Sequence, residues 1–209
     1  AKEICRRFEI SRQFWSYLVD TGRIADPQSF IHKVPHHTWV HDEEDVAYLR
    51  KRFEAMSADF MFEGMEFTTA VEEMKEWFPL MIDGRTNEGE AMAATRMERG
   101  TEVNFGVLTR HYLDILHKEF DVKVRYGCEV LDVDPKAEDW VVEVKDRKSK
   151  KKFRCGANHV FIGAGGGALL LLEKVEIPEK KGYGGFPVSG KWLVCKNREV
   201  IERHLAKVY

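Results

Sequence analysis

The sequence contains only four cysteines, and none of them lies close to another. Cys5, Cys128, Cys155 and Cys195 form no C-x-x-C pair. A disulfide framework or a cysteine-based zinc site would need paired or clustered cysteines. We therefore expect free thiols and a reducing compartment.

Long apolar runs and an excess of charge of one sign are also absent. No stretch approaches the ~20 apolar residues that a membrane-spanning helix needs. Thirty-three basic residues are balanced by 35 acidic ones, which leaves a formal charge of −2. No strong field would therefore attract nucleic acid, and we interpret the dense charge cluster at 145–154 as a solvated hairpin turn. Attachment to a membrane surface stays open.

Two motifs of other enzyme classes are missing or incomplete. No G-x-S-x-G is present, so a nucleophilic serine of the acyl-transfer type has no support. Residues 185–191 match the first seven positions of a P-loop, but Trp192 replaces the hydroxyl residue of the eighth position. Pro187 also removes a backbone N–H from the loop. We interpret this segment as a glycine-rich turn.

A glycine loop near the end of the chain is the strongest motif that is present. Gly163, Gly165 and Ala168 match the G-x-G-x-x-G/A fingerprint of a dinucleotide-binding turn. Such a turn needs glycine because its backbone bends tightly and approaches a pyrophosphate. About 20 residues later, where the fingerprint expects a strand ending in an acidic residue, the chain has the glycine-rich stretch 180–187. We therefore predict that 159–162 is the buried return strand of a flavin fold.

Apolar periodicity and turn residues divide the rest of the chain into elements. Helices are predicted at 2–19, 42–56, 71–78 and 107–120, and residues 199–209 are helical in character. An extended segment is predicted at 30–41, short strands and loops at 80–104, and alternating strands near 122–130, 142–144 and 153–155. Helical character at both ends suggests a piece of a longer chain.

The order of elements predicts a mixed α/β fold of the α+β kind. We expect part of an FAD/NAD(P)-binding flavoprotein fold with an antiparallel-sheet substrate domain, without the N-terminal βαβ unit that binds FAD. The predicted divisions are a helical joining segment at 1–30, a substrate-domain part at 31–99, the second half of the FAD-binding domain at 100–175, and a return to the substrate domain at 176–209.

Three histidines lie close together in the extended segment. On a strand, His37, Trp39 and His41 would lie on one face and His36 on the other. No carboxylate or cysteine set completes a zinc site around them, so we predict no metal. One of the histidines could serve as a proton acceptor, because imidazole titrates near neutral pH. A packed or solvent-exposed role is the open alternative.

Four arginines follow between 84 and 110. Arg85, Arg96, Arg99 and Arg110 could clamp a dicarboxylate in bidentate fashion. The alternative for each of them is an ion pair with a neighbouring acidic residue such as Glu98.

Several longer segments together resemble one family, the malate:quinone oxidoreductases. The resemblance is carried by Val34-Pro-His, Phe62-Glu-Gly-Met-Glu, Trp77-Phe-Pro-Leu-Met, Leu108-Thr-Arg and the segments 94–106, 160–169, 177–190 and 204–209. They follow in order through essentially the whole chain. The resemblance implies a peripheral membrane flavoprotein at the cytoplasmic face of the bacterial membrane. Such an enzyme uses FAD to oxidise (S)-malate to oxaloacetate and passes the electrons to quinone, without NAD.

The resemblance also suggests cofactor residues. Gly163, Ala164, Gly165 and Gly166 would approach the pyrophosphate or ribose of FAD. Val130 stands where such folds commonly meet the adenine through backbone atoms.

On the substrate side, we expect His36 to be the catalytic base and Arg96, Arg85 and His37 to bind malate. Another 2-hydroxy acid, such as 2-hydroxyglutarate, is an alternative substrate. A second alternative is an inactive isolated domain that only folds or mediates interaction, with self-association among its expected properties.

Overall fold

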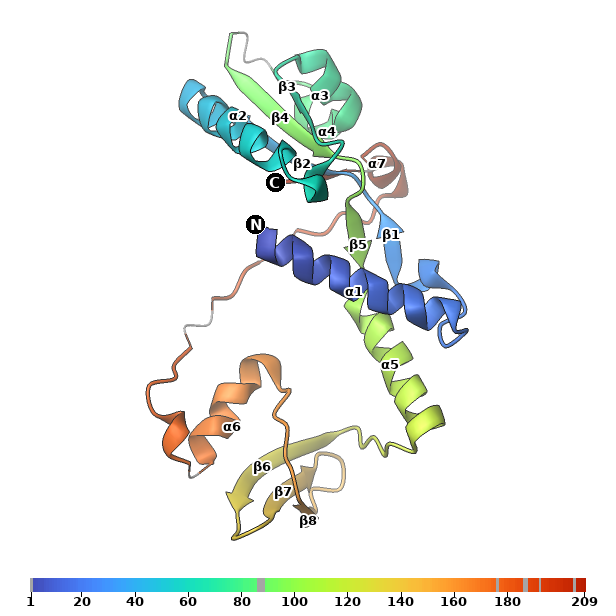
Figure 1. Cartoon of the computed structure of the whole chain (residues 1–209), viewed down its shortest axis with the longest axis vertical. Helices are drawn as coiled ribbons and strands as arrows, with labels where there is room; N and C mark the ends of the chain where they lie inside the picture. The colour runs from blue at the N-terminus through green and yellow to red at the C-terminus, as the bar shows by residue number, and fades with distance from the viewer. Residues whose placement is uncertain (1, 86–88, 176, 186–187, 192, 205) are drawn as a thin grey trace. The chain divides into compact units, whose positions relative to one another are not determined.

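The computed structural model describes the chain except residues 1, 86–88, 176, 186–187, 192 and 205. The chain forms two compact units, one of residues 1–121 with 194–209 and one of Val122–Leu193. The helices are α1 (Lys2–Asp20), α2 (Glu43–Ser57), α3 (Val71–Trp77), α4 (Pro79–Ile82), α5 (Phe105–Phe120), α6 (Ala168–Lys174) and α7 (Arg198–Glu202) (Figure 1). The strands are β1 (Ile31–Lys33), β2 (His36–His41), β3 (Glu66–Thr68), β4 (Met92–Met97), β5 (Thr101–Val103), β6 (Cys128–Pro135), β7 (Trp140–Asp146), β8 (Lys152–Ala157) and β9 (Lys207–Val208).

A four-stranded sheet in the order β3-β4-β2-β9 organises the first unit. β4 pairs antiparallel with both β2 and β3, whereas β9 pairs parallel with β2. Since β9 follows the second unit in the sequence, the sheet combines strands from both ends of the chain. The mixed α/β class with antiparallel sheets was predicted from the sequence and is confirmed.

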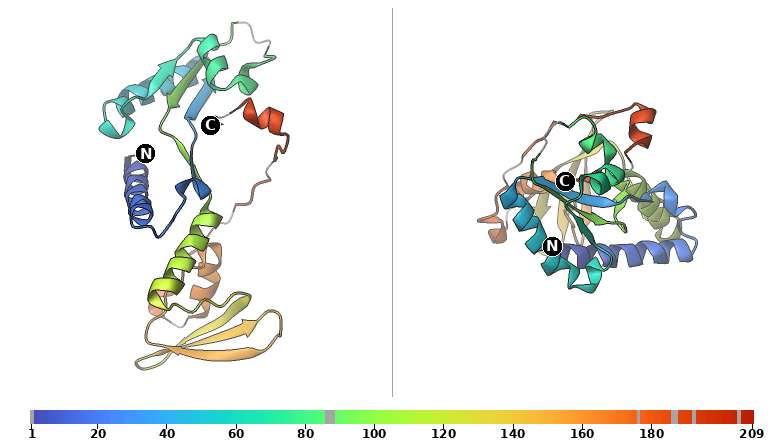
Figure 2. Two further views of the ribbon diagram at one scale, coloured as in Figure 1. Left: turned by 90° about the vertical axis from the view of Figure 1, so that its right-hand side faces the viewer. Right: turned by 90° about the horizontal axis from the view of Figure 1, so that it is seen from above.

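Helices cover both faces of this sheet (Figure 2). On one face, Met74 of α3, Ile82 of α4 and Phe78 between the two helices bury their side chains against Ala94. On the other face, Phe53 of α2 lies against Phe67 of β3, with ring centroids 5.5 Å apart. Burial of these apolar side chains is the main stabilising term for the layers.

A second core lies where α1 and α5 meet the short β1–β5 pair. Trp15, Leu18, Ile24, Phe30 and Leu108 are buried there together. The buried side of α1 supplies Trp15 and Leu18, whereas Ile4 at its beginning is 73% exposed.

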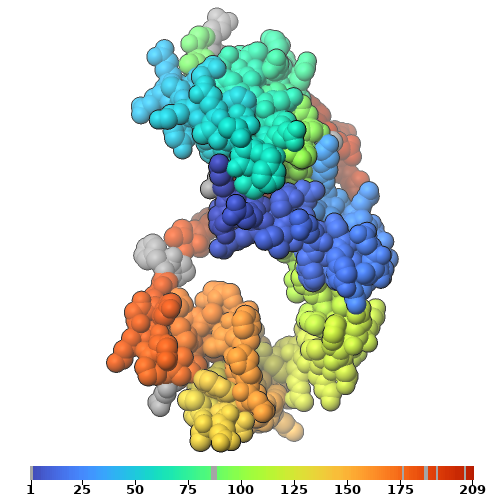
Figure 3. All heavy atoms as spheres, in the orientation of Figure 1, coloured from blue at the N-terminus to red at the C-terminus, as the bar shows by residue number. Residues whose placement is uncertain are grey.

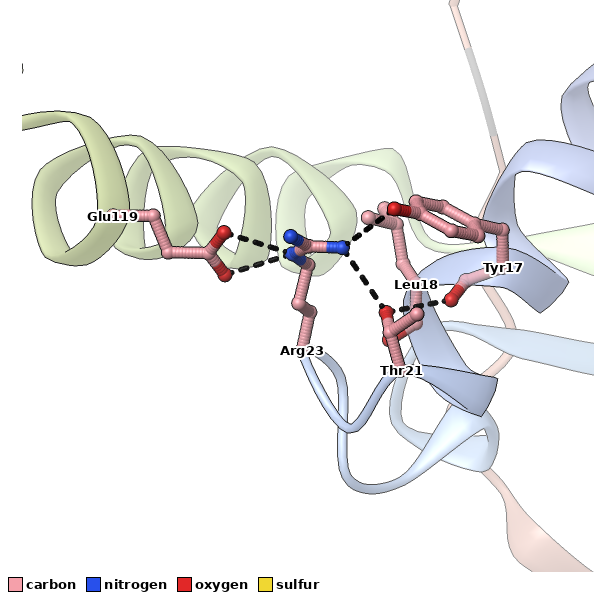
Figure 4. A network of polar contacts seen from close by, with 5 residues as sticks. All are labelled: Tyr17, Leu18, Thr21, Arg23 and Glu119. Carbon is pink, nitrogen blue, oxygen red and sulfur yellow. Dashed lines mark hydrogen bonds and ion pairs between the residues drawn. The ribbon is translucent and has the colours of Figure 1, made fainter.

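Polar contacts join α5 to α1 and to the turn that follows α1. The Arg23 Nε–H lies 2.8 and 2.9 Å from the two carboxylate oxygens of Glu119, and its Nη1 donates to the Tyr17 hydroxyl at 2.9 Å (Figure 4). The indole N–H of Trp15 donates to Tyr112. The Arg23–Glu119 and Trp15–Tyr112 contacts link segments about 100 residues apart in sequence.

The second unit contains an antiparallel meander in the order β6-β7-β8. A bulge interrupts β6 between Val130 and Asp132. The Lys174 ammonium at the end of α6 donates to the Leu131 carbonyl at 2.8 Å, which ties the helix after the glycine loop to β6.

Two predicted strands are corrected in this unit. Residues 122–127 form no strand, because the chain turns at Gly127 with φ +66° and β6 begins only at Cys128. The predicted buried strand at 159–162 is also not formed, and Phe161 is 87% exposed. A strand satisfies its backbone groups by pairing, and no strand among the described residues pairs with this segment.

The structure also differs from the predictions at Pro79 and at residues 199–209. Pro79 ends α3 as expected, but it then begins the short helix α4, because its missing N–H is tolerated at a first helical position. The helical character predicted for 199–209 holds only for α7. Residues 207–208 form β9 instead, with Val208 packed against the α3–α4 core.

None of the helices in the described part of the chain is both long enough and apolar enough to span a membrane. In the P-loop-like segment, Phe186, Pro187 and Trp192 lie outside the described residues.

Candidate functional site

Strand β2 places its two adjacent histidines on opposite faces of the sheet. His36 is opposite Met97 of β4, whereas His37 is opposite Arg96. Side chains of directly paired residues lie on the same face, and successive residues alternate. The predicted base and the predicted substrate arginine Arg96 therefore lie on different sides of the sheet.

The His36 side opens into a pocket of about 720 Å³ within the first unit. The pocket lies between α1, the segment around the 3₁₀ turn Phe60–Phe62 and the ends of β2 and β4. Figure 3 shows the atoms of α1 packed against those of this turn. The volume falls within the ~300–1,000 Å³ that is usual for ligand sites.

The imidazole of His36 is held in one orientation in this pocket. Its Nε2 lies 3.1 Å from the Thr101 carbonyl oxygen. Since a carbonyl only accepts hydrogen bonds, Nε2 carries a proton, and in the neutral imidazole Nδ1 therefore carries the lone pair. The ring of Tyr209 packs edge-on against the imidazole, with centroids 5.9 Å apart. The residue can therefore accept a proton at Nδ1.

Two further polar groups line the same pocket. The Thr101 hydroxyl is buried and has no hydrogen-bond partner among the described residues. The Arg99 guanidinium donates to the Glu63 carbonyl at 2.9 Å, but it forms no ion pair within the described part of the chain. An unneutralised guanidinium suits recognition of a carboxylate.

The opposite face holds His37, which is only 2% exposed. Both ring nitrogens lack a hydrogen-bond partner of good geometry among the described residues. Burial foremost, and then the nearby charge of Arg96, lowers the pKa of His37 to about 4, although the Lys207 backbone acts in the other direction. The imidazole is therefore neutral at physiological pH.

The Arg96 side chain is already engaged on this face. It forms ion pairs with Glu66, at 3.5 Å, and with Glu98, and it lies over the Trp77 ring. Lys33 and Arg96 together lower the pKa of Glu98. A pocket of about 440 Å³ borders His37 and Arg96, and its lining carries charges of both signs.

Arg85 belongs to the same side of the sheet. Its guanidinium lies 4.6 Å from the centroid of the Trp39 ring and 3.6 Å from a Glu90 carboxylate oxygen. The structure thus brings Arg85 and Arg96 to the His37 face and leaves His36 with Arg99 and Thr101 on the other.

The predicted cofactor residues all lie in the second unit. Gly163, Ala164, Gly165 and Gly166 are exposed, and Gly165 has φ +53°. A Cβ built on Gly165 or Gly166 would meet nothing within 4 Å. The loop thus offers an accessible backbone in front of α6, as a nucleotide contact requires. Val130 pairs with Val144 of β7, immediately before the bulge.

Metal binding finds no support among the described residues, where no group of three His, Cys, Asp or Glu side chains could hold an ion. The four cysteines are free.

The sequence did not single out Thr101, Arg99 or Tyr209 as lining residues of one pocket. Arg99 was recognised as one of four arginines, but nothing in its spacing set it apart. The only available signal was strand alternation from His36 through the paired strands, and this required the register of β2 against β4.

Comparisons with known proteins agree along the whole chain. The family model of malate:quinone oxidoreductase (Mqo) matches residues 1–209. Probable malate:quinone oxidoreductases of Flavobacterium johnsoniae, Halalkalibacterium halodurans and Bradyrhizobium diazoefficiens are 48%, 50% and 50% identical over all of this chain. The chain covers 42%, 42% and 41% of the lengths of these three relatives. This chain belongs to the malate:quinone oxidoreductase family.

Proposed function

We propose that the chain is part of an enzyme that oxidises (S)-malate to oxaloacetate and passes the electrons to quinone. The observation that carries this proposal is the family match along all 209 residues. The relatives that bear this name are longer than the chain, so the activity is proposed for the full-length enzyme.

On the substrate side, His36 would act as the general base. Its Nε2–H is held by the Thr101 carbonyl, so the Nδ1 lone pair is available for the hydroxyl proton of malate. Arg99, which has no acidic partner among the described residues, is better suited to hold a malate carboxylate than Arg96. His37, Arg96 and Arg85 would then have a structural role on the opposite face of the sheet.

The redox cofactor proposed for the enzyme is FAD, which supplies a hydride acceptor when bound. The exposed backbone at Gly163–Gly166, with open space beside Gly165 and Gly166, fits a phosphate or ribose contact. Val130 would contribute backbone contacts to the adenine. This unit would then be the second half of an FAD-binding fold.

We also propose a peripheral location at the cytoplasmic face of the membrane. A quinone acceptor with an apolar tail resides in the bilayer, so an enzyme that reduces it must reach the lipid surface.

Replacing His36 by Gln in the full-length enzyme tests the proposed base. General-base help contributes about 10²–10⁴ in rate, so kcat with malate and a soluble quinone should fall by that factor while KM changes little. His32→Gln, at an exposed position of β1, is the matched control and should leave kcat unchanged. A His36→Gln enzyme with kcat within about threefold of the parent would remove His36 as the base.

The same assay distinguishes the alternative substrate. Malate and 2-hydroxyglutarate are compared at equal concentration with the same quinone. A higher kcat/KM for 2-hydroxyglutarate would assign the enzyme to another 2-hydroxy acid.

A further inference from the structure

We propose that Gly100 is a positioning residue for His36, because its missing side chain creates the space that the imidazole occupies. The inference rests on the proposed function only in taking His36 as the base. It concerns the packing around the ring and assigns no direct contact between Gly100 and a substrate.

The geometry at Gly100 leaves no room for a methyl group. A Cβ at this position would lie 2.5 and 2.8 Å from Cδ2 and Cγ of His36, and 2.4 Å from the Val34 carbonyl oxygen. Real Cβ atoms essentially never come this close to a neighbour. Any side chain at position 100 would therefore move the ring or the backbone beside it.

Backbone conformation is not the reason for glycine here. The φ of Gly100 lies outside the left-handed region that favours glycine, unlike that of Gly165. Among the described glycines, Gly185 has a similarly close neighbour, but that neighbour is the tip of the flexible Leu169 side chain. Gly100 instead faces a ring and a backbone oxygen.

The local chain path explains how the space arises. The paired strands β1–β5 continue into β2–β4, and at the junction Val34 and Pro35 lie opposite the three residues 98–100. The Val34 N–H donates to the Gly100 carbonyl at 2.9 Å, which holds the backbone of Gly100 close to β2. An extra residue on one strand is a bulge, a device that often re-aims a side chain beside a site.

The next residue, Thr101, provides the second contact that positions the His36 ring. The Thr101 carbonyl accepts from Nε2 at 3.1 Å, so packing by Gly100 and one hydrogen bond together fix the ring and its tautomer. A displaced ring would lose this hydrogen bond and with it the defined lone pair at Nδ1.

Gly100→Ala in the full-length enzyme is the first test. Misplacing a reacting group by about 1 Å can lower rate about 10²-fold, so kcat should fall by about that factor while KM for malate changes little. Gly156→Ala is the control, because a Cβ there meets nothing within 4 Å and its φ is ordinary. A Gly100→Ala enzyme with kcat within about threefold of the parent overturns the inference.

A double-mutant cycle separates positioning from general damage to the fold. In a His36→Ala background there is no ring to displace and only the Val34 carbonyl is crowded, so adding Gly100→Ala should lower kcat by a clearly smaller factor than it does in the parent. An equal fall in both backgrounds would mean that Gly100 acts by another route, and the inference would be wrong. If His36→Ala itself leaves kcat unchanged, the proposed base is wrong, irrespective of Gly100.

A measurement on the unchanged enzyme covers the case in which Gly100→Ala does not fold. NMR of ¹⁵N-histidine-labelled protein, with His36 assigned by comparison with His36→Ala, should show the Nε2–H tautomer for the neutral imidazole. An Nδ1–H tautomer would directly contradict the proposed positioning of the His36 ring against Gly100 and the Thr101 carbonyl.

Discussion

The two adjacent histidines of β2 have different surroundings, although they differ by a single position in sequence. His36 has one ring nitrogen hydrogen-bonded to a carbonyl and lines a pocket, whereas His37 is buried on the other face of the sheet with its pKa lowered to about 4. Strand alternation predicted that they lie on opposite faces. The sequence could not predict which face is buried from solvent, because that depends on where α3 and α4 pack.

His37 should make the stability of the enzyme depend on pH. In the unfolded chain a histidine has a pKa near 6.5, so between pH 6.5 and 4 the unfolded state binds more protons than the folded state. The stability from neutral His37 is therefore complete above pH 6.5 and is lost as the pH falls toward 4, by up to roughly 3 kcal/mol. Thermal unfolding of the full-length enzyme at pH 7 and pH 5 measures the change.

His37→Leu is the comparison for that experiment. The variant should lose less Tm between pH 7 and pH 5 than the parent, with a remainder from His204, whose pKa is also lowered by burial. An identical fall in Tm in both proteins would contradict the low pKa of His37.

Thr101 and Thr68 form a matched pair of buried hydroxyls. The Thr101 hydroxyl has no partner among the described residues, whereas that of Thr68 accepts from the Ala70 N–H at 2.9 Å. Thr101→Val should leave stability unchanged or raise it, and Thr68→Val should lower it by about 1 kcal/mol. Urea unfolding monitored by circular dichroism measures both.

The Thr101 variant also has a functional readout. If its hydroxyl contacts substrate, Thr101→Val raises KM for malate although the fold is intact. A destabilised Thr101→Val protein would indicate a hydrogen bond that the structure does not contain.

At the scale of elements, helix ends were well predicted because their signals are local. Asn104 accepts from the Val107 N–H and begins α5, and Asp42 accepts from the Asp45 N–H ahead of α2. Asn and Asp are residue types that favour the N-cap position, so both helix starts have a local signal in the sequence. The strand predicted at 159–162 was wrong because a strand also depends on a partner, which local sequence does not specify.

The Arg23 contacts predict an element-scale effect on stability. Arg23→Ala removes the contacts that tie the turn after α1 to Glu119 of α5, and it raises the pKa of Glu119 toward its usual range. The Tm of the full-length enzyme should fall. Arg12→Ala, which breaks an ion pair within α1 alone, should change Tm less. Equal shifts for the two variants would show that Arg23 acts as an ordinary surface arginine.

For the whole molecule, the glycine loop provides a test of cofactor binding. Gly166→Val adds a side chain where nothing lies within 4 Å, so the apoenzyme should fold normally. If the loop contacts FAD, the purified full-length enzyme should contain less flavin by visible absorbance. Gly156→Val in β8, also with open space at its Cβ, is the control and should keep its flavin. Full flavin content in Gly166→Val would remove the loop from the cofactor site.

The sequence predicted the order of the secondary-structure elements better than it predicted how they assemble into units. The order of helices and the meander followed from periodicity, and the family followed from the motifs. The pairing of β9 with β2 did not, because strands at opposite ends of the chain come together only through long-range packing. The predicted boundaries near 30, 99 and 175 and the predicted self-association stay predictions.

The place of β9 in the sheet has a consequence for how the protein folds during its synthesis on the ribosome. Its partner β2 is translated early, but β9 emerges only after the whole of Val122–Leu193. At about 5–20 residues per second, the roughly 166 residues from the end of β2 at His41 to the start of β9 at Lys207 take about 8–33 seconds. During that time the edge of β2 has no parallel neighbour, and Val208 is missing from the α3–α4 core. The nascent chain must therefore carry an incomplete sheet through the synthesis of an entire second unit.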